Sequence, residues 1–326
     1  MRDDTAEIRP IVIAKKQPGF VETPYVRNAI SRALNYIRAG YPVHFAGPAS
    51  TGKTSLALYT AAQLDRPVML VHGDEQFNTS DLVGGEQGYR RRKLVDNFIH
   101  SVTKTDESFS VEWMEKRLTA ACKHGFTLLY DEFTRSRPEA NNALLSVLEE
   151  KVLDLPAARG EEGYLSVHPD FSAIFTSNPT EYAGVYAAQD ALKDRMITIK
   201  LGHYDRETEI AITCARSGIS RPQAENIVDI VRAARNGGKT PTVRSCIMLG
   251  RVLKQGNGKL STKDGSFVEA CLDILASEAG EIDEVSIMSL IQKHSSSKEE
   301  CTGNRRKSKR QIPSTKHSGF QLKGGS

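Results

Sequence analysis

One short stretch of this sequence has the residue types and spacing of a loop that holds phosphate groups. It follows the pattern Gly-x-x-x-x-Gly-Lys-Thr and consists of Gly47, Pro48, Ala49, Ser50, Thr51, Gly52, Lys53 and Thr54. The two glycines let backbone N–H groups approach a β-phosphate, and the N-terminus of a following helix adds a positive dipole end. Lys53 is expected to pair with the β- and γ-phosphates, and Thr54 to offer its hydroxyl to Mg²⁺. The stretch therefore predicts a binding site for ATP with Mg²⁺.

Two adjacent carboxylates follow an apolar run later in the chain. Residues Phe126–Tyr130 are expected to form a strand, and Asp131 and Glu132 come directly after it. At the carboxyl end of a strand, Asp131 can reach the water shell of Mg²⁺ and Glu132 can polarise a water for in-line attack. An Asp-Glu pair in a solvated loop is the ordinary alternative, but the apolar strand before it favours catalysis. The two motifs together predict an Mg²⁺-dependent ATPase.

Three single residues are further candidates for the same site, each with a plainer alternative. Asn178 follows the predicted strand Ser172–Thr176 and could hold the attacking water or contact the γ-phosphate, although Ser-Asn-Pro is also a common turn. Arg195 precedes the last predicted strand and could be offered to a neighbouring subunit's phosphate, although such an arginine is more often a surface ion-pair partner. Arg244 opens a predicted helix and could reach back to the nucleotide from a second domain.

Strands and helices alternate over the part of the chain that carries these motifs. Short apolar runs predict strands at 41–46, 67–71, 126–130, 172–176 and 196–201. Helical periodicity or composition predicts helices at 24–39, 55–64, 111–123 and 138–150. Two further short runs, 151–155 and 164–168, flank a turn-rich segment and predict a hairpin. This alternation is typical of a parallel sheet between two layers of helices.

From residue 205 onward the pattern changes to helices alone. Segments with helical periodicity, separated by glycines, lie at 205–216, 221–235, 242–254 and 267–277. The expected fold class is therefore α/β, a P-loop NTPase with a three-layer αβα parallel sheet followed by a smaller all-helical lid domain. The expected division is an N-terminal extension at 1–20, a nucleotide-binding domain at 21–203 with an insert within 83–110, a lid at 204–294 and a disordered basic tail at 295–326.

Composition excludes several other classes of protein. The 326 residues are 39% hydrophobic and 26% charged, and no stretch approaches the roughly 18–20 uninterrupted apolar residues of a membrane span. The first residues lack the apolar region of a secretory signal, so the expected compartment is the cytoplasm. The five cysteines and eight histidines are dispersed and predict no metal site beyond the Mg²⁺ of the nucleotide. The net charge is +4, of which residues 295–326 carry +6 and the remaining residues −2, so the body is nearly neutral.

The motifs, taken in order, resemble the AAA+ superfamily and, within it, the MoxR branch. The matching segments are Walker A at 47–54, Walker B at 127–132, 176–179, 192–195 and Arg244. Residues 131–138 and 142–150 look like the Walker B motif and following helix of that branch, and 18–24 is similar to the gas-vesicle members of the group that also holds the NorQ and CbbQ chaperones. The resemblance covers about residues 20–255. Two departures are Ala49-Ser50 in place of Pro-Gly, and Met196 where Phe usually follows the arginine.

The resemblance implies roles for the matching residues and a mode of assembly. It assigns Lys53, Thr54, Asp131 and Glu132 to nucleotide, Mg²⁺ and catalysis, Asn178 to sensor 1, Arg195 to a finger acting in the neighbouring subunit, and Arg244 to sensor 2. It also implies a homo-oligomeric ring, usually a hexamer, with the insert facing the pore. The implied role is ATP-driven remodelling or chaperoning of gas-vesicle assembly, with gas-vesicle proteins as partners, among them the cargo protein that decorates the shell, and with association to the vesicle.

Two other functions stay open at this point. A MoxR-type chaperone that inserts a metal or activates another enzyme would share every catalytic residue. A nucleic-acid motor is supported only by the tail and by the basic cluster Arg90–Lys93, and the nearly neutral body argues against it. A small-molecule kinase also uses a phosphate-binding loop but has no need of the water-activating pair Asp131-Glu132.

Overall fold

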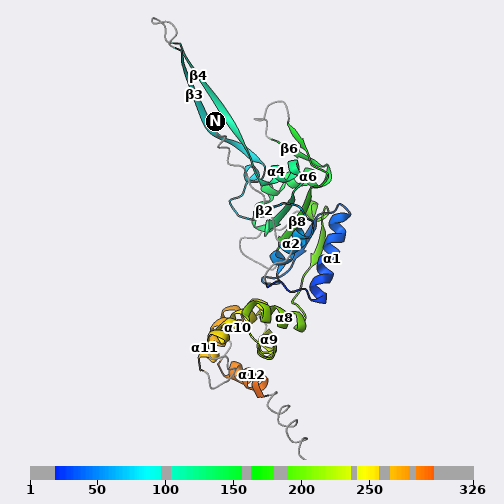
Figure 1. Ribbon diagram of the computed structural model, residues 1–326, viewed down its shortest axis with the longest axis vertical. Helices are drawn as coiled ribbons and strands as arrows, with labels where there is room; N and C mark the ends of the chain where they lie inside the picture. Colours follow the sequence, from blue (N-terminus) through cyan, green and yellow to red (C-terminus); the bar gives the residue numbers. More distant parts are fainter. Residues whose placement is uncertain are drawn as a thin grey trace, which may run out of the picture.

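A parallel five-stranded sheet organises the part of the chain that carries the motifs (Figure 1). The computed structural model describes residues 19–96, 104–155, 163–179, 190–235, 241–256, 265–279 and 284–296. The strands are β1 (Val43–Ala46), β2 (Val68–His72), β5 (Thr127–Asp131), β8 (Ser172–Ser177) and β9 (Ile197–Lys200), and they lie in the order β2-β5-β8-β1-β9. All pairs are parallel, so the carboxyl ends of the strands meet at one edge.

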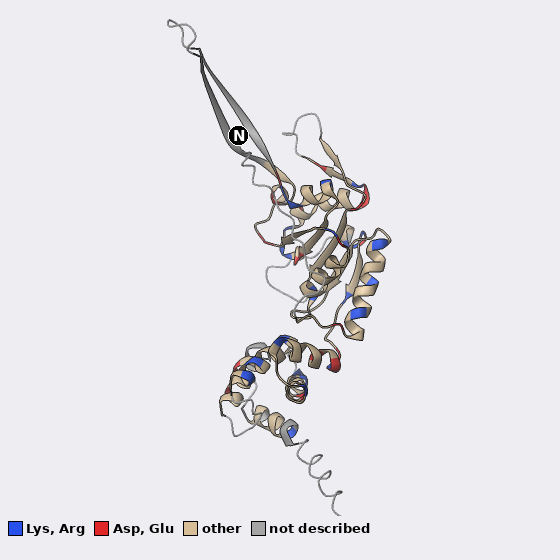
Figure 2. Ribbon diagram, in the orientation of Figure 1, with Lys and Arg blue, Asp and Glu red and all other residues tan. Residues whose placement is uncertain are grey.

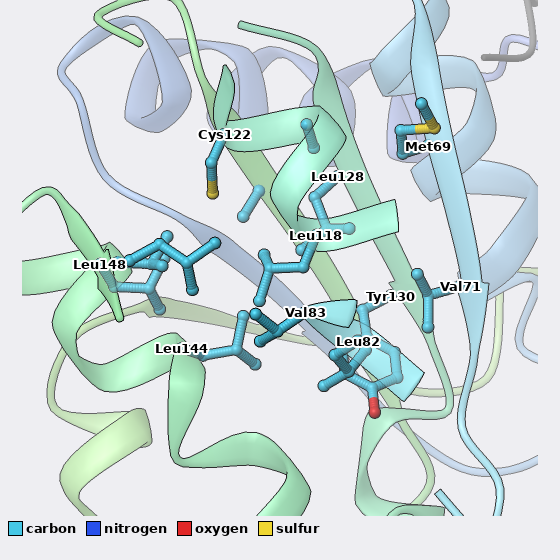
Figure 3. Close-up of a cluster of buried hydrophobic side chains, with 14 of the residues drawn as sticks. Met69, Val71, Leu82, Val83, Leu118, Cys122, Leu128, Tyr130, Leu144 and Leu148 are labelled. Carbon is cyan, nitrogen blue, oxygen red and sulfur yellow. The ribbon is translucent and has the colours of Figure 1, made fainter. Parts of the chain in front are cut away.

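Each face of the sheet is covered by its own layer of helices and holds its own core. On one face, α1 (Pro24–Arg38) and α2 (Lys53–Ala62) pack against Phe45 and Leu129. On the other face, α4 (Arg117–His124) and α6 (Ala143–Glu149) pack over Tyr130 (Figure 3). Neighbouring residues of one strand enter opposite cores because strand side chains alternate between the two faces. The expected three-layer αβα fold is confirmed.

Local sequence signals explain where several of these helices begin and end. The side chain of Thr23 accepts a hydrogen bond from the backbone N of Val26, and Pro24 occupies the first position of α1. The helix α4 ends at Gly125, whose φ of 69° is the left-handed conformation that glycine adopts most easily. We predicted one helix over 138–150, but the structure has two, α5 (Pro138–Asn141) and α6, separated at Asn142.

Two hairpins project from the sheet layer. The first lies between α3 (Thr79–Leu82) and α4 and consists of β3 (Gly84–Asp96) and β4 (Lys104–Glu115), paired antiparallel from Gly84 with Glu115 to Asp96 with Lys104. In Figure 1 it extends away from the body of the protein. The predicted helix over 111–123 was wrong in its first part, because the chain stays paired in β4 as far as Glu115. The second hairpin, β6 (Val152–Asp154) with β7 (Tyr164–Ser166), confirms the one predicted from the sequence.

Helices follow the sheet. A short helix, α7 (Asp190–Lys193), precedes β9, and α8 (Arg206–Ser217), α9 (Arg221–Arg235), α10 (Val243–Gln255), α11 (Gly265–Ala279) and α12 (Glu284–Ser296) come after it. Helices α8 to α12 share a core that includes Ile227, Leu249 and Leu275. We did not predict α12 from the sequence, and it runs two residues into the segment expected to be a tail. Residues 1–18 and 297–326, which hold most of the expected extension and tail, lie outside the described residues.

Positions of Lys and Arg and positions of Asp and Glu are spread along the described part of the ribbon (Figure 2). The helix α1 differs, because its exposed positions include Arg27, Arg32 and Arg38 and its sequence contains no acidic residue. The basic cluster Arg90–Lys93 lies on β3. Among the described residues, no helix is long and apolar enough to cross a bilayer.

Candidate active site

The loop between β1 and α2 has the backbone of an anion-binding nest. Ser50 and Gly52 have φ values of 59° and 73°, on either side of Thr51, and left-handed residues of this kind turn successive N–H groups toward one side of the chain. The hydroxyl of Thr51 donates to the carbonyl of Pro48 over 2.9 Å and braces the turn. The local conformation therefore fits the phosphate-binding role predicted for this loop.

The two glycines of the loop are also required by its packing. A Cβ at Gly47 would lie 2.4 Å from the carbonyl oxygen of Leu201, and a Cβ at Gly52 would lie 2.3 Å from the hydroxyl of Tyr204. Both contacts are with the segment that leads from β9 to the first lid helix, α8. Any larger residue at either position would push the loop away from this segment, so the glycines fix where the loop lies as well as its shape.

Lys53 begins α2 and is buried at the centre of the loop. Its Nζ donates to the carbonyl oxygens of Gly47 over 2.9 Å and Pro48 over 2.7 Å. The ammonium group is thereby held against the same loop whose N–H groups would receive a phosphate. A fixed positive charge at this place suits the β- and γ-phosphates of a nucleotide.

Asp131 is the centre of a hydrogen-bond network at the carboxyl edge of the sheet. Its Oδ1 accepts from the hydroxyl of Thr54 over 2.8 Å and from that of Thr176 over 2.6 Å. Its Oδ2 lies 3.6 Å from Nδ1 of His72, at the end of the neighbouring strand β2. Thr54 and Asp131 are thus brought together as predicted, and their hydroxyl and carboxylate oxygens are the ligand types that Mg²⁺ prefers.

Thr176 was not among the individual site residues that we predicted. Besides donating to Asp131, its hydroxyl oxygen accepts from the backbone N of Glu132 over 2.9 Å. It therefore links the end of β8 to the carboxylate of Asp131 and to the backbone of Glu132. The only signal in the sequence is a hydroxyl two residues before Asn178. Whether this hydroxyl reaches Asp131 depends on the register between β5 and β8.

Glu132 adopts a left-handed backbone conformation, with φ 54° and ψ 41°, at the start of the 3₁₀ turn Phe133–Arg135. For a residue other than glycine such a conformation costs on the order of 1–3 kcal/mol and is common at functional sites. The carboxylate is exposed and forms an ion pair with Nε of Arg135 over 2.8 Å. The adjacent Gly73 leaves room for this turn, because a Cβ there would lie 2.0 Å from the carbonyl oxygen of Glu132. Sequence reasoning did not identify Arg135 or Gly73.

A cleft of about 620 Å³ joins these groups to the helical part of the chain. Lys53, Thr54 and Glu132 line it from the sheet side, together with Asn178, which follows β8. Ala49, Ser50 and Gly52 of the phosphate-binding loop line it as well. Arg244 lines it from α10, so that seven predicted residues of the sheet part and one of the helical part meet in one cavity. The other residues lining this cleft include Phe20, Val21, Tyr204, Ile212, Arg216 and Arg251. The volume falls within the range of about 300–1,000 Å³ that is usual for small-molecule sites.

Arg195 lies apart from this cleft. Its Nε donates to Oε2 of Glu149 over 2.7 Å, its Nη2 contacts the same oxygen, and its Nη1 donates to the carbonyl of Ala191 over 2.6 Å. The residue therefore does not complete the cleft of its own chain, and its action in a neighbouring subunit stays a prediction. The following Met196, where the resemblance leads us to expect Phe, is buried in the core beside α4 and α6.

Together these residues fit a nucleoside triphosphate with Mg²⁺. The nest and Lys53 offer donors and positive charge, and Thr54 with Asp131 offers hard oxygen ligands. Arg244 and three further arginines, Arg135, Arg216 and Arg251, add positive charge along the cleft. The arrangement is suited to holding a polyphosphate while Glu132 acts on a water molecule.

Comparisons with known proteins give the family context. Residues 42–196 match the AAA domain of the dynein-related subfamily. The chain is 53% identical to gas vesicle ATPase GvpN of Ancylobacter aquaticus, over 81% of this chain and 74% of that protein. It is 41% identical to gas vesicle ATPase GvpN1 of Halobacterium salinarum, over 83% of this chain and 78% of that protein. Protein CbbQ of Hydrogenophilus thermoluteolus is 23% identical over 65% of this chain and 73% of its own length.

Proposed function

The chain belongs to the family of gas vesicle ATPases GvpN, and we propose that it uses ATP hydrolysis to remodel or chaperone proteins during gas-vesicle assembly or maturation. It is an ATPase with an AAA domain. The reaction is supported by one observation above all: Lys53, Thr54, Glu132, Asn178 and Arg244 line one cleft. The gas-vesicle role is supported by the identity to the named relatives.

In the proposed reaction, the loop N–H groups and Lys53 bind the β- and γ-phosphates, and Thr54 and Asp131 would hold Mg²⁺. When bound, Mg²⁺ would neutralise charge on the phosphate oxygens. Glu132 accepts a hydrogen bond from the attacking water and takes its proton as the water oxygen bonds to the γ-phosphorus. The bond between that phosphorus and the oxygen that bridges to the β-phosphate breaks at the same time, and ADP leaves with this oxygen. To take the proton, the carboxylate of Glu132 must leave the ion pair with Arg135 and form a hydrogen bond with the water instead. The amide of Asn178 holds that water or the γ-phosphate in line.

The proposed active form is a homo-oligomeric ring, with a hexamer as the expected state. Arg195 would then leave Glu149 and reach the γ-phosphate in the cleft of the next subunit, where a guanidinium stabilises charge in the transition state. The expected partners are gas-vesicle proteins, among them the cargo protein on the shell, and the expected location is the cytoplasm, in association with the vesicle.

Deleting the gene in a host that forms gas vesicles tests this role. We expect loss of buoyant, light-scattering vesicles, restored by the wild-type gene but not by Glu132→Gln. A matched control is Glu75→Gln, which makes the same change at an exposed residue that does not line the cleft and should restore the vesicles. Vesicles of normal size and number in the deletion strain would contradict the proposal.

The second candidate is a MoxR-type chaperone that activates a metalloenzyme or another complex. The likeness to CbbQ favours it, and the same catalytic residues would serve it. The same deletion strain separates the two functions, because normal vesicles with a lost enzyme activity would support this alternative. A nucleic-acid motor is the least favoured function.

A further inference from the structure

The strand that leads into the phosphate-binding loop carries a buried histidine that the proposed mechanism does not use. His44 lies in the middle of β1 and is 5% exposed. Its neighbours Val43 and Phe45 enter the core beside α1 and α2, so the histidine points to the opposite face of the sheet. A polar ring at the centre of a sheet is costly unless its nitrogens are paired, so its partners indicate why it is there.

Both ring nitrogens of His44 bond to hydroxyls on the two strands that flank β1. Nε2 lies 2.8 Å from Oγ of Ser177 on β8, and Nδ1 lies 3.1 Å from Oγ1 of Thr198 on β9. The bond to Thr198 is directly across the strands, and that to Ser177 is diagonal, because His44 pairs in register with Phe175. The ring therefore connects three adjacent strands through side chains.

A third contact links the ring to the turn that follows β5. The aromatic ring of Phe133 meets His44 edge to face, with centroids 5.3 Å apart and planes at 87°. Phe133 is buried and directly follows Glu132. Through this contact the histidine also touches the segment that carries the catalytic carboxylate.

Each contact lies close to a residue of the proposed site. Ser177 directly precedes Asn178, Phe133 directly follows Glu132, and Thr198 comes three residues after Arg195. Through these contacts His44 joins β1 to all three of these segments.

The ring is neutral near neutral pH. Burial, with a smaller contribution from the positive charge of Lys193, lowers the pKa of His44 to about 4. A neutral imidazole has one N–H donor and one acceptor nitrogen, so one hydroxyl accepts from the ring and the other donates to it. The two bonds therefore form a connected chain from β8 to β9 across β1.

We infer that His44 is a positioning residue, which holds the carboxyl ends of the neighbouring strands in the arrangement that ATP hydrolysis requires. The inference rests on the proposed ATPase site. Because the histidine does not reach the cleft, it acts through Ser177 and Phe133 on the residues next to them. A displacement of about 1 Å in a catalytic group can cost on the order of 100-fold in rate.

Three substitutions test the inference separately. Ser177→Ala removes the hydrogen bond between His44 and residue 177, which directly precedes Asn178. Thr198→Val removes the hydrogen bond between His44 and residue 198 with little change of side-chain shape, and His44→Leu removes both hydrogen bonds. We expect Ser177→Ala and His44→Leu to lower kcat about 10-fold or more, while the Kd for ATP, measured with a fluorescent analogue, changes less than about twofold. The change His44→Gln restores a donor and an acceptor and should recover part of the lost kcat.

A hydroxyl pair at the other end of the same sheet provides the matched control. Oγ1 of Thr127 lies 3.1 Å from Oγ of Ser172, where β5 and β8 begin, away from the cleft. Ser172→Ala removes this pair and should leave kcat within about twofold of wild type. If Ser177→Ala keeps full kcat, or if Ser172→Ala loses as much as Ser177→Ala, the positioning role is wrong. If His44→Leu does not fold, the comparison of kcat between Ser177→Ala and Ser172→Ala still tests the positioning role.

The variant Glu132→Gln separates this inference from the proposed site. If it retains turnover, the site itself is wrongly assigned, whatever the serine variants do. If it loses turnover while Ser177→Ala and His44→Leu keep theirs, the site stands and only the role of His44 is contradicted.

Discussion

At the scale of single residues, the site depends on two carboxylates that do different work. Asp131 is buried and accepts from Thr54 and Thr176, which suits a fixed ligand for Mg²⁺. Glu132 lines the cleft, and its half-exposed side chain forms an ion pair with Arg135, three residues later in the chain. Surface pairs of this kind contribute about 0–1 kcal/mol, so the carboxylate can leave its partner at little cost.

The change Glu132→Gln should therefore stop turnover and keep ATP binding. The amide is similar in size but cannot take a proton from water, and the groups that bind phosphate are untouched. We expect kcat to fall by at least about 100-fold and the Kd for ATP to stay within a few-fold of wild type. Steady-state phosphate release and equilibrium binding of a fluorescent ATP analogue measure the two quantities.

A matched change at the neighbouring ion-pair partner is the control. Arg135→Gln removes the same ion pair and leaves the carboxylate in place, so it should retain most of the turnover. Hydrolysis at the wild-type rate by Glu132→Gln would refute its catalytic role.

The sequence predicted the residues that define the cleft but not those that support them. The sequence alone predicts one site for Lys53, Thr54, Glu132 and Asn178, because the carboxyl ends of parallel strands meet at one edge. The supporting roles of Thr176 and His44 depend on which residues face each other across strands. That register comes from the packing of the whole sheet, and no local pattern of residue types determines it.

At the scale of elements, α8 and α9 are tied together by a buried ionic cluster. Glu209 on α8 is 1% exposed, and its carboxylate accepts from Arg232 over 2.9 Å and from Arg235 over 2.6 Å, both on α9. Arg235 also donates to the carbonyl of Pro241, just before α10. One carboxylate thus fixes the helix that carries Arg244 relative to the first two lid helices.

The change Glu209→Gln should destabilise the protein strongly. It leaves the guanidinium of Arg235, whose side chain is 12% exposed, without its buried anionic partner, and the loss of one partner of a buried pair typically costs about 3–5 kcal/mol. The control Glu207→Gln lies on the same helix at an exposed position, where ion pairs with arginines contribute about 0–1 kcal/mol. Urea denaturation of both variants gives the free energies of unfolding, and equal values for the two would show that the buried cluster does not stabilise the lid.

Helices and strands were predicted correctly where the sequence fits one periodicity clearly. The prediction was wrong where a segment with helical spacing is paired as a strand. Val111, Met114 and Leu118 fit a helical spacing, yet Val111 belongs to β4 because residues 104–115 pair with β3. The helix α12 was missed although Ile287 and Ile291, one turn apart and both buried, carried the signal. We placed residues 284–294 in the lid without predicting a helix there, and the serines at 295–297 set the expected start of the tail.

At the scale of the whole molecule, the positions of the cleft and of Arg195 bear on assembly. Arg195 bonds to Glu149 and does not line the cleft of its own chain, while Arg244 does. A chain of this design would bind ATP alone but would need a neighbour to hydrolyse it quickly. We therefore propose a composite site, with Glu132 from one subunit and Arg195 from the next.

Mixing two inactive variants tests whether the site is shared between subunits. Homogeneous preparations of Glu132→Gln and of Arg195→Ala should each lose ATP turnover, because each lacks one half of every site. In rings mixed 1:1, a subunit with an intact Glu132 can meet a neighbour with an intact Arg195, so we expect recovery of about a quarter of the wild-type rate. Subunit exchange is verified by pull-down of differently tagged chains, and mixed rings that stay as inactive as the parent variants would contradict the composite site.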